Sequence, residues 1–117
     1  MMHNEKKLAN IVEELTMFFF TVGAAKIQSC IWIEEDQGCI EFTADYKAEY
    51  RDRLNSLEEY FNEPKNEGLV DFYWELAGSG DPGEENQLLL VGMMIDKAEV
   101  EITDDKVTVR LYRKLES

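Results

Sequence analysis

The sequence has 117 residues, which is enough for one domain but not for two domains with separate cores. With 44% of its residues hydrophobic and 11% aromatic, the chain can build an apolar core, so we expect it to fold. Twelve Lys and Arg against 25 Asp and Glu give a net charge of −13, which repels nucleic-acid phosphate and anionic lipid. We therefore expect neither a nucleic acid nor a membrane surface as partner.

The longest apolar stretch, residues 15–25, is about half as long as a membrane-spanning helix. Glu13 and Glu14 precede it, at positions where a signal peptide would be apolar. These features predict a cytoplasmic protein.

The first predicted element is an amphipathic helix that begins near Asn4 and ends near Gly23. Its apolar positions follow the three- and four-residue spacing of one helix face: Leu8, Ile11, Val12, Leu15, Phe18, Phe19 and Val22. A hairpin follows over residues 27–46, with alternating apolar residues on both sides of a turn centred on Asp36 and Gln37. One face of this hairpin is almost entirely apolar and carries Ile27, Ser29, Ile31, Ile33, Ile40, Phe42, Ala44 and Tyr46.

The two cysteines, Cys30 and Cys39, lie in this hairpin. The predicted register sets Cys30 opposite Thr43 and Cys39 opposite Glu34, so the two thiols are four residues out of register, or roughly 13 Å apart. We therefore expect two free thiols in a reducing compartment. A metal site is not expected, because the single histidine lies near the N-terminus and no Cys-x-x-Cys motif occurs.

Three helices are predicted in the middle of the chain. The first carries Tyr50, Leu54, Leu57 and Phe61 on one face, and the second is short and spans residues 69–76. The third runs from residue 81 through residue 95, because Asp81, Pro82 and Glu84 form a helix start signal; its buried stripe is predicted to hold Leu88, Val91 and Ile95.

A second hairpin is predicted at the C-terminal end, with Asp104 and Asp105 as its turn. One face carries Ala98, Val100, Ile102, Val107, Val109 and Leu111. On the other face Glu99 lies opposite Arg110, which predicts a cross-strand ion pair. The whole order predicts one α+β domain over residues 1–117, a two-layer sandwich whose mixed or antiparallel sheet of two hairpins carries all helices on one face.

A glycine-rich loop, residues 78–83, precedes the last predicted helix. Gly78, Gly80 and Gly83 could present backbone amides to a phosphate group at the start of that helix. A loop followed by a capping box explains the same residues, and we favour that interpretation.

The order of elements, with a glycine loop before the last helix and hairpin, resembles the GHKL ATPase family of histidine kinases, anti-sigma factors, gyrase and heat-shock chaperones. The resemblance covers residues 8–113 and implies a histidine-kinase-like ATPase topology that binds ATP and Mg²⁺. It places Glu13 or Glu14 at the acidic position of the family's E-x-x-x-N box and Asp45 at the adenine-reading aspartate. It also places Gly78, Gly80 and Gly83 at the phosphate loop.

The sequence departs from the family at the positions that handle nucleotide. Met17 and Phe18 stand where the Mg²⁺-binding Asn belongs, and Asp45 is not followed by the glycines of the family's D-x-G-x-G motif. Asp81, Glu84 and Glu85 also place negative charge where a triphosphate would sit. We therefore expect a regulatory or interaction module without catalytic residues or cofactor, and the alternative is an ATP-binding anti-sigma or histidine-kinase-like domain.

Apolar side chains on the outer face of the sheet predict a protein interface. Trp32 and Cys30 project from the first hairpin on the side opposite the core, and Tyr112 projects from the second. Single exposed apolar residues are also normal on protein surfaces, so the pattern has a simpler explanation. A second copy of the chain and a basic protein that complements the charge of −13 both stay open as partners.

Overall fold

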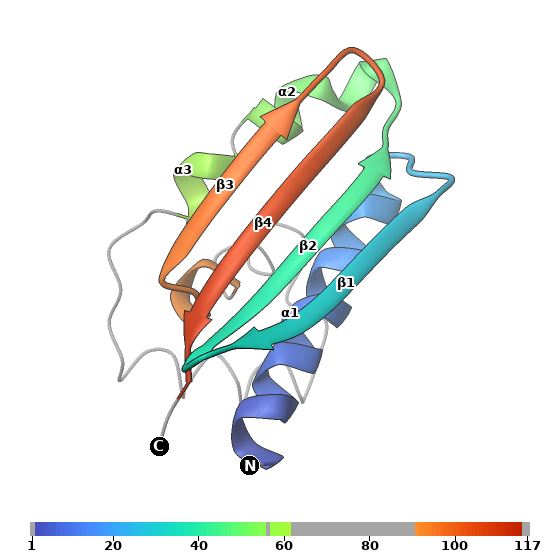
Figure 1. Ribbon diagram of the computed structural model, residues 1–117. Helices are drawn as coiled ribbons and strands as arrows, with labels where there is room; N and C mark the ends of the chain where they lie inside the picture. The colour runs from blue at the N-terminus through green and yellow to red at the C-terminus, as the bar shows by residue number, and fades with distance from the viewer. Residues whose placement is uncertain (1, 56, 62–90, 116–117) are drawn as a thin grey trace.

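The computed structural model describes residues 2–55, 57–61 and 91–115 of the chain (Figure 1). Helix α1 (Met2–Thr21) leads into the hairpin of β1 (Ile27–Glu34) and β2 (Gln37–Asp45). Three short helices follow: the 3-10 helix η1 (Ala48–Tyr50), α2 (Arg51–Asn55) and α3 (Leu57–Phe61). Residues 91–94 are helical and lead into the second hairpin, formed by β3 (Lys97–Ile102) and β4 (Lys106–Lys114).

The four strands form one antiparallel sheet in the order β1-β2-β4-β3. The two hairpins therefore meet in the middle, where β2 pairs with β4, and β1 and β3 form the edges. Helices α1, α2 and α3 lie behind the sheet in Figure 1, so one face is covered by helices and the other faces the viewer. The predicted α+β domain, with two hairpins in one sheet and a helix packed against it, is confirmed.

Helix α1 ends at the predicted position for a geometric reason. Gly23 has a φ of +82°, a left-handed conformation that glycine adopts without strain. The backbone N–H of Ala24 donates to the carbonyl of Phe19 at 3.1 Å, and the N–H of Gly23 donates to the carbonyl of Phe20 at 3.1 Å. These two bonds form a Schellman motif, which satisfies the last carbonyls of the helix and turns the chain toward β1.

The core lies between α1 and the covered face of the sheet. The helix contributes a buried stripe, and all its predicted apolar positions are buried except Val12, which is half-buried. The ring of Phe19 lies 5.5 Å from that of Phe42 on β2. The other main contributors are Leu54, Leu57, Phe61, Val91, Met94, Ile95, Val107, Val109 and Leu111.

The register of the first hairpin differs from the prediction by two residues. Cys30 lies opposite Glu41 and Cys39 opposite Trp32, because the turn consists of Glu35 and Asp36, with Glu35 at a φ of +57°. Both cysteines are free, as expected, but they are two residues out of register rather than four.

Gly38, which the predicted register set opposite Glu35, lies opposite Ile33 in the structure. It belongs to β2 and not to the turn, and a Cβ atom at this position would lie 2.9 Å from both terminal methyl carbons of Leu8. The glycine is therefore required by the close approach of α1 to the strand. The slip of two residues leaves every side chain on its predicted face, because side chains alternate with a period of two.

The second hairpin has the predicted register, with Glu99 opposite Arg110. All described residues of the helix predicted over residues 50–61 are helical: η1 runs directly into α2, and α2 and α3 lie on either side of residue 56, which is outside the described residues. The predicted helix at residues 69–76, the glycine loop with Gly78, Gly80 and Gly83, and Leu88 lie outside the described residues.

Two neighbouring phenylalanines on α1 test the core assignment. Phe19 is fully buried, whereas Phe20 is 58% exposed. We expect Phe19→Ala to lower the free energy of unfolding by about 3–5 kcal/mol through lost burial and a residual cavity, and Phe20→Ala to change it by less than about 0.5 kcal/mol. Urea denaturation of both variants measures these values, and equal midpoints would contradict the placement of α1 on the sheet.

Candidate interaction surface

Asp45 stands at the end of β2 and holds the beginning of β1. Its Oδ1 atom accepts hydrogen bonds from the backbone N–H groups of Lys26 at 3.0 Å and Ala25 at 2.8 Å. These two bonds, that of Lys26 first, lower the pKa of the Asp45 carboxyl group, because they favour the ionised form. The candidate adenine-reading residue therefore has a structural task in this chain.

Of the other residues that the resemblance matches to the ATPase family, the structure describes those on α1 but not the three glycines. Glu13 is exposed and Glu14 half-buried on α1. At the position of the missing Asn, Met17 is exposed and Phe18 is buried in the core. Gly78, Gly80 and Gly83 lie outside the described residues.

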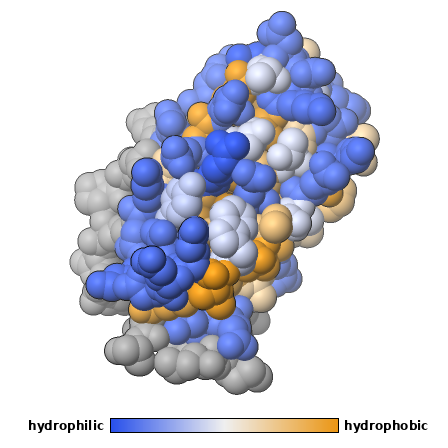
Figure 2. Space-filling model, viewed as in Figure 1, coloured by the Kyte–Doolittle hydropathy of each residue, from blue (hydrophilic) through white to orange (hydrophobic). Residues whose placement is uncertain are grey.

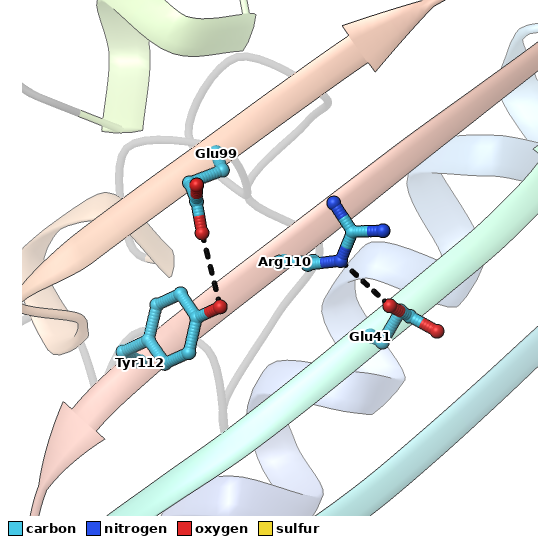
Figure 3. Close-up of polar contacts among 4 residues, drawn as sticks. All are labelled: Glu41, Glu99, Arg110 and Tyr112. Atoms are coloured by element: carbon cyan, nitrogen blue, oxygen red, sulfur yellow. Dashed lines mark hydrogen bonds and ion pairs between the residues drawn. The ribbon is translucent and has the colours of Figure 1, made fainter.

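The outer face of the sheet carries a polar network that spans β2, β4 and the edge strand β3 (Figure 3). The Nε–H of Arg110 donates to Oε2 of Glu41 on β2 at 2.7 Å, and this hydrogen bond raises the pKa of Arg110. The predicted ion pair between Glu99 and Arg110 is replaced by this contact. Glu99 instead accepts a hydrogen bond from the hydroxyl of Tyr112 at 3.0 Å, so its carboxylate is directed toward the neighbouring ring.

Cys39 lies in the same face but is buried. The register sets it between Trp32 on β1 and Tyr112 on β4, and only 1% of its surface is exposed. Burial, followed by the charge of Glu34, raises the pKa of the Cys39 thiol. This thiol therefore stays protonated and unreactive at neutral pH. The sequence pattern placed Cys39 on the outer face, but it did not indicate that neighbouring side chains cover it.

The three predicted interface residues are not equivalent. Cys30 is exposed and Trp32 is 38% exposed, and both lie on the edge strand β1. Tyr112 is half-buried, bonded to Glu99, and has the Nζ atom of Lys97 5.7 Å from its ring centre. Tyr112 thus belongs to the polar network, and of the three predicted interface residues only the two on β1 remain available to a partner.

Two residues that sequence reasoning assigned to the core extend this surface. Ile31 and Ile33 lie on the helix-covered face of the sheet, yet they are 46% and 56% exposed. The buried layer thus does not extend over this part of the edge strand. We call Ile31, Trp32 and Ile33 the apolar edge. Figure 2 shows a largely hydrophilic outer face on which hydrophobic residues gather toward the lower part.

Metal-ligating clusters and membrane-spanning helices are both absent from the described residues. Over residues 2–55, 57–61 and 91–115, no group of three or more His, Cys, Asp or Glu side chains could hold a metal ion. Within the same part of the chain, no helix is long and apolar enough to cross a membrane. Comparison with protein-family models and with curated protein sequences finds no match to this chain.

The role of Asp45 predicts a pH-dependent stability. Its pKa is lowered in the folded state, so its contribution is fully present above the unfolded value of 3.8 and is lost as pH falls through the folded value. We expect the wild type to exceed Asp45→Asn in stability near pH 7 and this advantage to shrink below about pH 4. Urea midpoints across this range measure it.

Asp104→Asn is the matched control, because Asp104 is exposed in the β3–β4 turn. A stability difference between the wild type and Asp45→Asn that stays constant with pH would contradict the structural role of the Asp45 carboxylate.

Proposed function

We propose that this chain is a non-catalytic, nucleotide-free protein-interaction or regulatory module with GHKL-like topology. One observation carries the proposal: the apolar edge exposes three consecutive large hydrophobic residues on a strand at the border of the sheet. Consecutive residues of a strand point to opposite faces, so these side chains are exposed on both faces at once. A partner that covers β1 removes all three from water.

The chemistry of a sheet edge supports this proposal. An edge strand offers unpaired backbone N–H and C=O groups, and natural proteins usually protect such edges with charged residues, proline or a bulge. Residues 27–33 of β1 include no charged residue and no proline. A protein strand placed here would gain backbone hydrogen bonds together with apolar burial.

The alternative is an ATP-binding domain of the anti-sigma or histidine-kinase type. Its support is the position of Asp45 at the end of β2, where the family resemblance places the adenine-reading aspartate. Against it stand the two backbone hydrogen bonds that the Asp45 carboxylate already accepts and the missing Asn on α1.

Calorimetric titration with ATP and Mg²⁺ distinguishes the two functions. We expect no binding heat for the full chain, because the Mg²⁺-binding Asn and the glycines after Asp45 are missing from the sequence. Micromolar binding that is lost in Asp45→Asn and kept in Asp104→Asn would establish the ATPase alternative. Circular dichroism of both variants checks that any loss is not due to unfolding.

The type of partner is tested by sedimentation at low and high salt. Self-association through apolar contacts should persist or strengthen with salt, because the −13 charges of two copies repel each other less when screened. Docking to a basic protein should weaken instead. We expect Trp32→Lys to reduce self-association, whereas Asp104→Asn, which changes the net charge equally, should not. A strict monomer under all conditions, indifferent to Trp32→Lys, would leave only the different partner.

A further inference from the structure

The free edge of β1 presents its backbone in a defined pattern. The carbonyl of Lys26 accepts a hydrogen bond from the N–H of Asp45 at 3.4 Å, so the even-numbered residues of β1 direct their backbone groups toward β2. Because hydrogen-bonded and non-hydrogen-bonded pairs alternate in antiparallel sheets, the odd-numbered residues direct theirs toward the opposite side. In the described part of the sheet β1 has only one neighbour, so Ser29 and Ile31 offer N–H and C=O groups at the border.

The charges on this strand are arranged symmetrically about its centre. Lys26 precedes β1 and Glu34 ends it, and both are exposed. Between them the strand carries no charged residue, so residues 26–34 hold one positive and one negative charge. Cys30 is midway between Lys26 and Glu34. Two such strands placed antiparallel about Cys30 bring opposite charges together at both ends.

We propose that β1 pairs antiparallel with β1 of a second copy of this chain, about a two-fold axis through Cys30. The inference rests on the proposed function as an interaction module and names its partner. In this register Lys26 lies opposite the partner's Glu34, and Ile27 lies opposite the partner's Ile33. Ser29 and the partner's Ile31 form a hydrogen-bonded pair, and the four-stranded sheet continues into that of the second copy.

Neighbouring registers fit less well. In a continuous sheet the outer faces of both copies lie on the same side, so residues opposite each other must be both even-numbered or both odd-numbered. The two-fold axis therefore always passes through a residue of β1, and a different register moves it from Cys30 to another residue. An axis through Ile31 sets Lys26 opposite the partner's Asp36, which lies in the β1–β2 turn and outside the strand, and an axis through Ser29 sets Lys26 opposite the partner's Trp32. Only the axis at Cys30 sets Lys26 opposite an acidic residue of β1 itself, so charge complementarity along the strand favours this axis.

The same register makes Cys30 a reporter of the interface. Its backbone groups point toward its own β2, so Cys30 and the partner's Cys30 form a non-hydrogen-bonded pair with Cα atoms about 4.5 Å apart. This separation lies within the range that a disulfide bridges. Diamide should therefore join the two exposed thiols, taking up both hydrogens as the sulfur–sulfur bond forms.

The first test uses proline at the border of the strand. Ser29→Pro removes an N–H group that points away from β2, so the hairpin keeps its own hydrogen bonds, whereas each copy loses a bond to its partner. We expect sedimentation to show dimerisation about tenfold or more weaker than in the control Ser29→Ala, which keeps the backbone N–H. Equal dimerisation of the two variants would overturn strand pairing.

The second test is the cross-link. We expect diamide to convert the native full chain into a covalent dimer linked through Cys30, and Cys39→Ser to behave in the same way because Cys39 is buried. Cys30→Ser should give no cross-link. The double variant Cys30→Ser with Ile31→Cys moves the thiol by one residue. If this variant cross-links faster than the native chain, the axis lies at Ile31 and the proposed register is wrong. If Ser29→Pro does not fold, this test decides alone.

The outcomes also separate this inference from the proposed function. A chain that stays monomeric at every protein and salt concentration would overturn pairing with a second copy. The proposed function as an interaction module would then still depend on the result of the ATP titration. Binding of ATP and Mg²⁺ that depends on Asp45 would overturn the proposed function, whether or not the chain dimerises.

Discussion

The pairing of β2 with β4 is the contact on which the domain depends, because it joins two hairpins that lie far apart in the sequence. It places Phe42 beside Val109 on the buried face. On the outer face it places Glu41 beside Arg110. An isolated two-stranded hairpin is at best marginally stable in water, since nothing covers its apolar face. Pairing in the middle joins the strands on which α1 packs, β1 and β2, to β3, against which α3 packs, and the remaining two strands become edges.

Much of this arrangement can be predicted from the sequence, because apolar periodicity reports directly on which face of a strand or helix is buried. The faces of both hairpins and the end of α1 at Gly23 follow from it. The turn of the first hairpin could not be predicted in this way. Gly38 is of a residue type that is common in turns, but here a glycine is needed because Leu8 of the helix α1 packs against it. The local sequence does not reveal that contact.

The candidate site shows a second limit of sequence reasoning. Alternation assigned Ile31 and Ile33 to the same face as Ile40, and this assignment is correct, yet only Ile40 is buried. Whether a face is covered depends on how far the helical layer extends, which is a property of the assembled domain. Asp45 shows the reverse case: its position at the end of β2 was predicted, but its hydrogen bonds to the start of β1 depend on the folded hairpin.

An exposed apolar edge is a hazard for a protein, because it can pair with any other free strand. The high net charge limits this hazard. At a separation of several ångströms beyond contact, −13 on each copy opposes random encounters, and salt screens the repulsion over about 8 Å at physiological ionic strength. Residues 26–34 carry one charge of each sign, so the same repulsion is weakest where two copies meet edge to edge. Charge therefore disfavours most approaches of two copies and favours the antiparallel pairing of their β1 strands about Cys30.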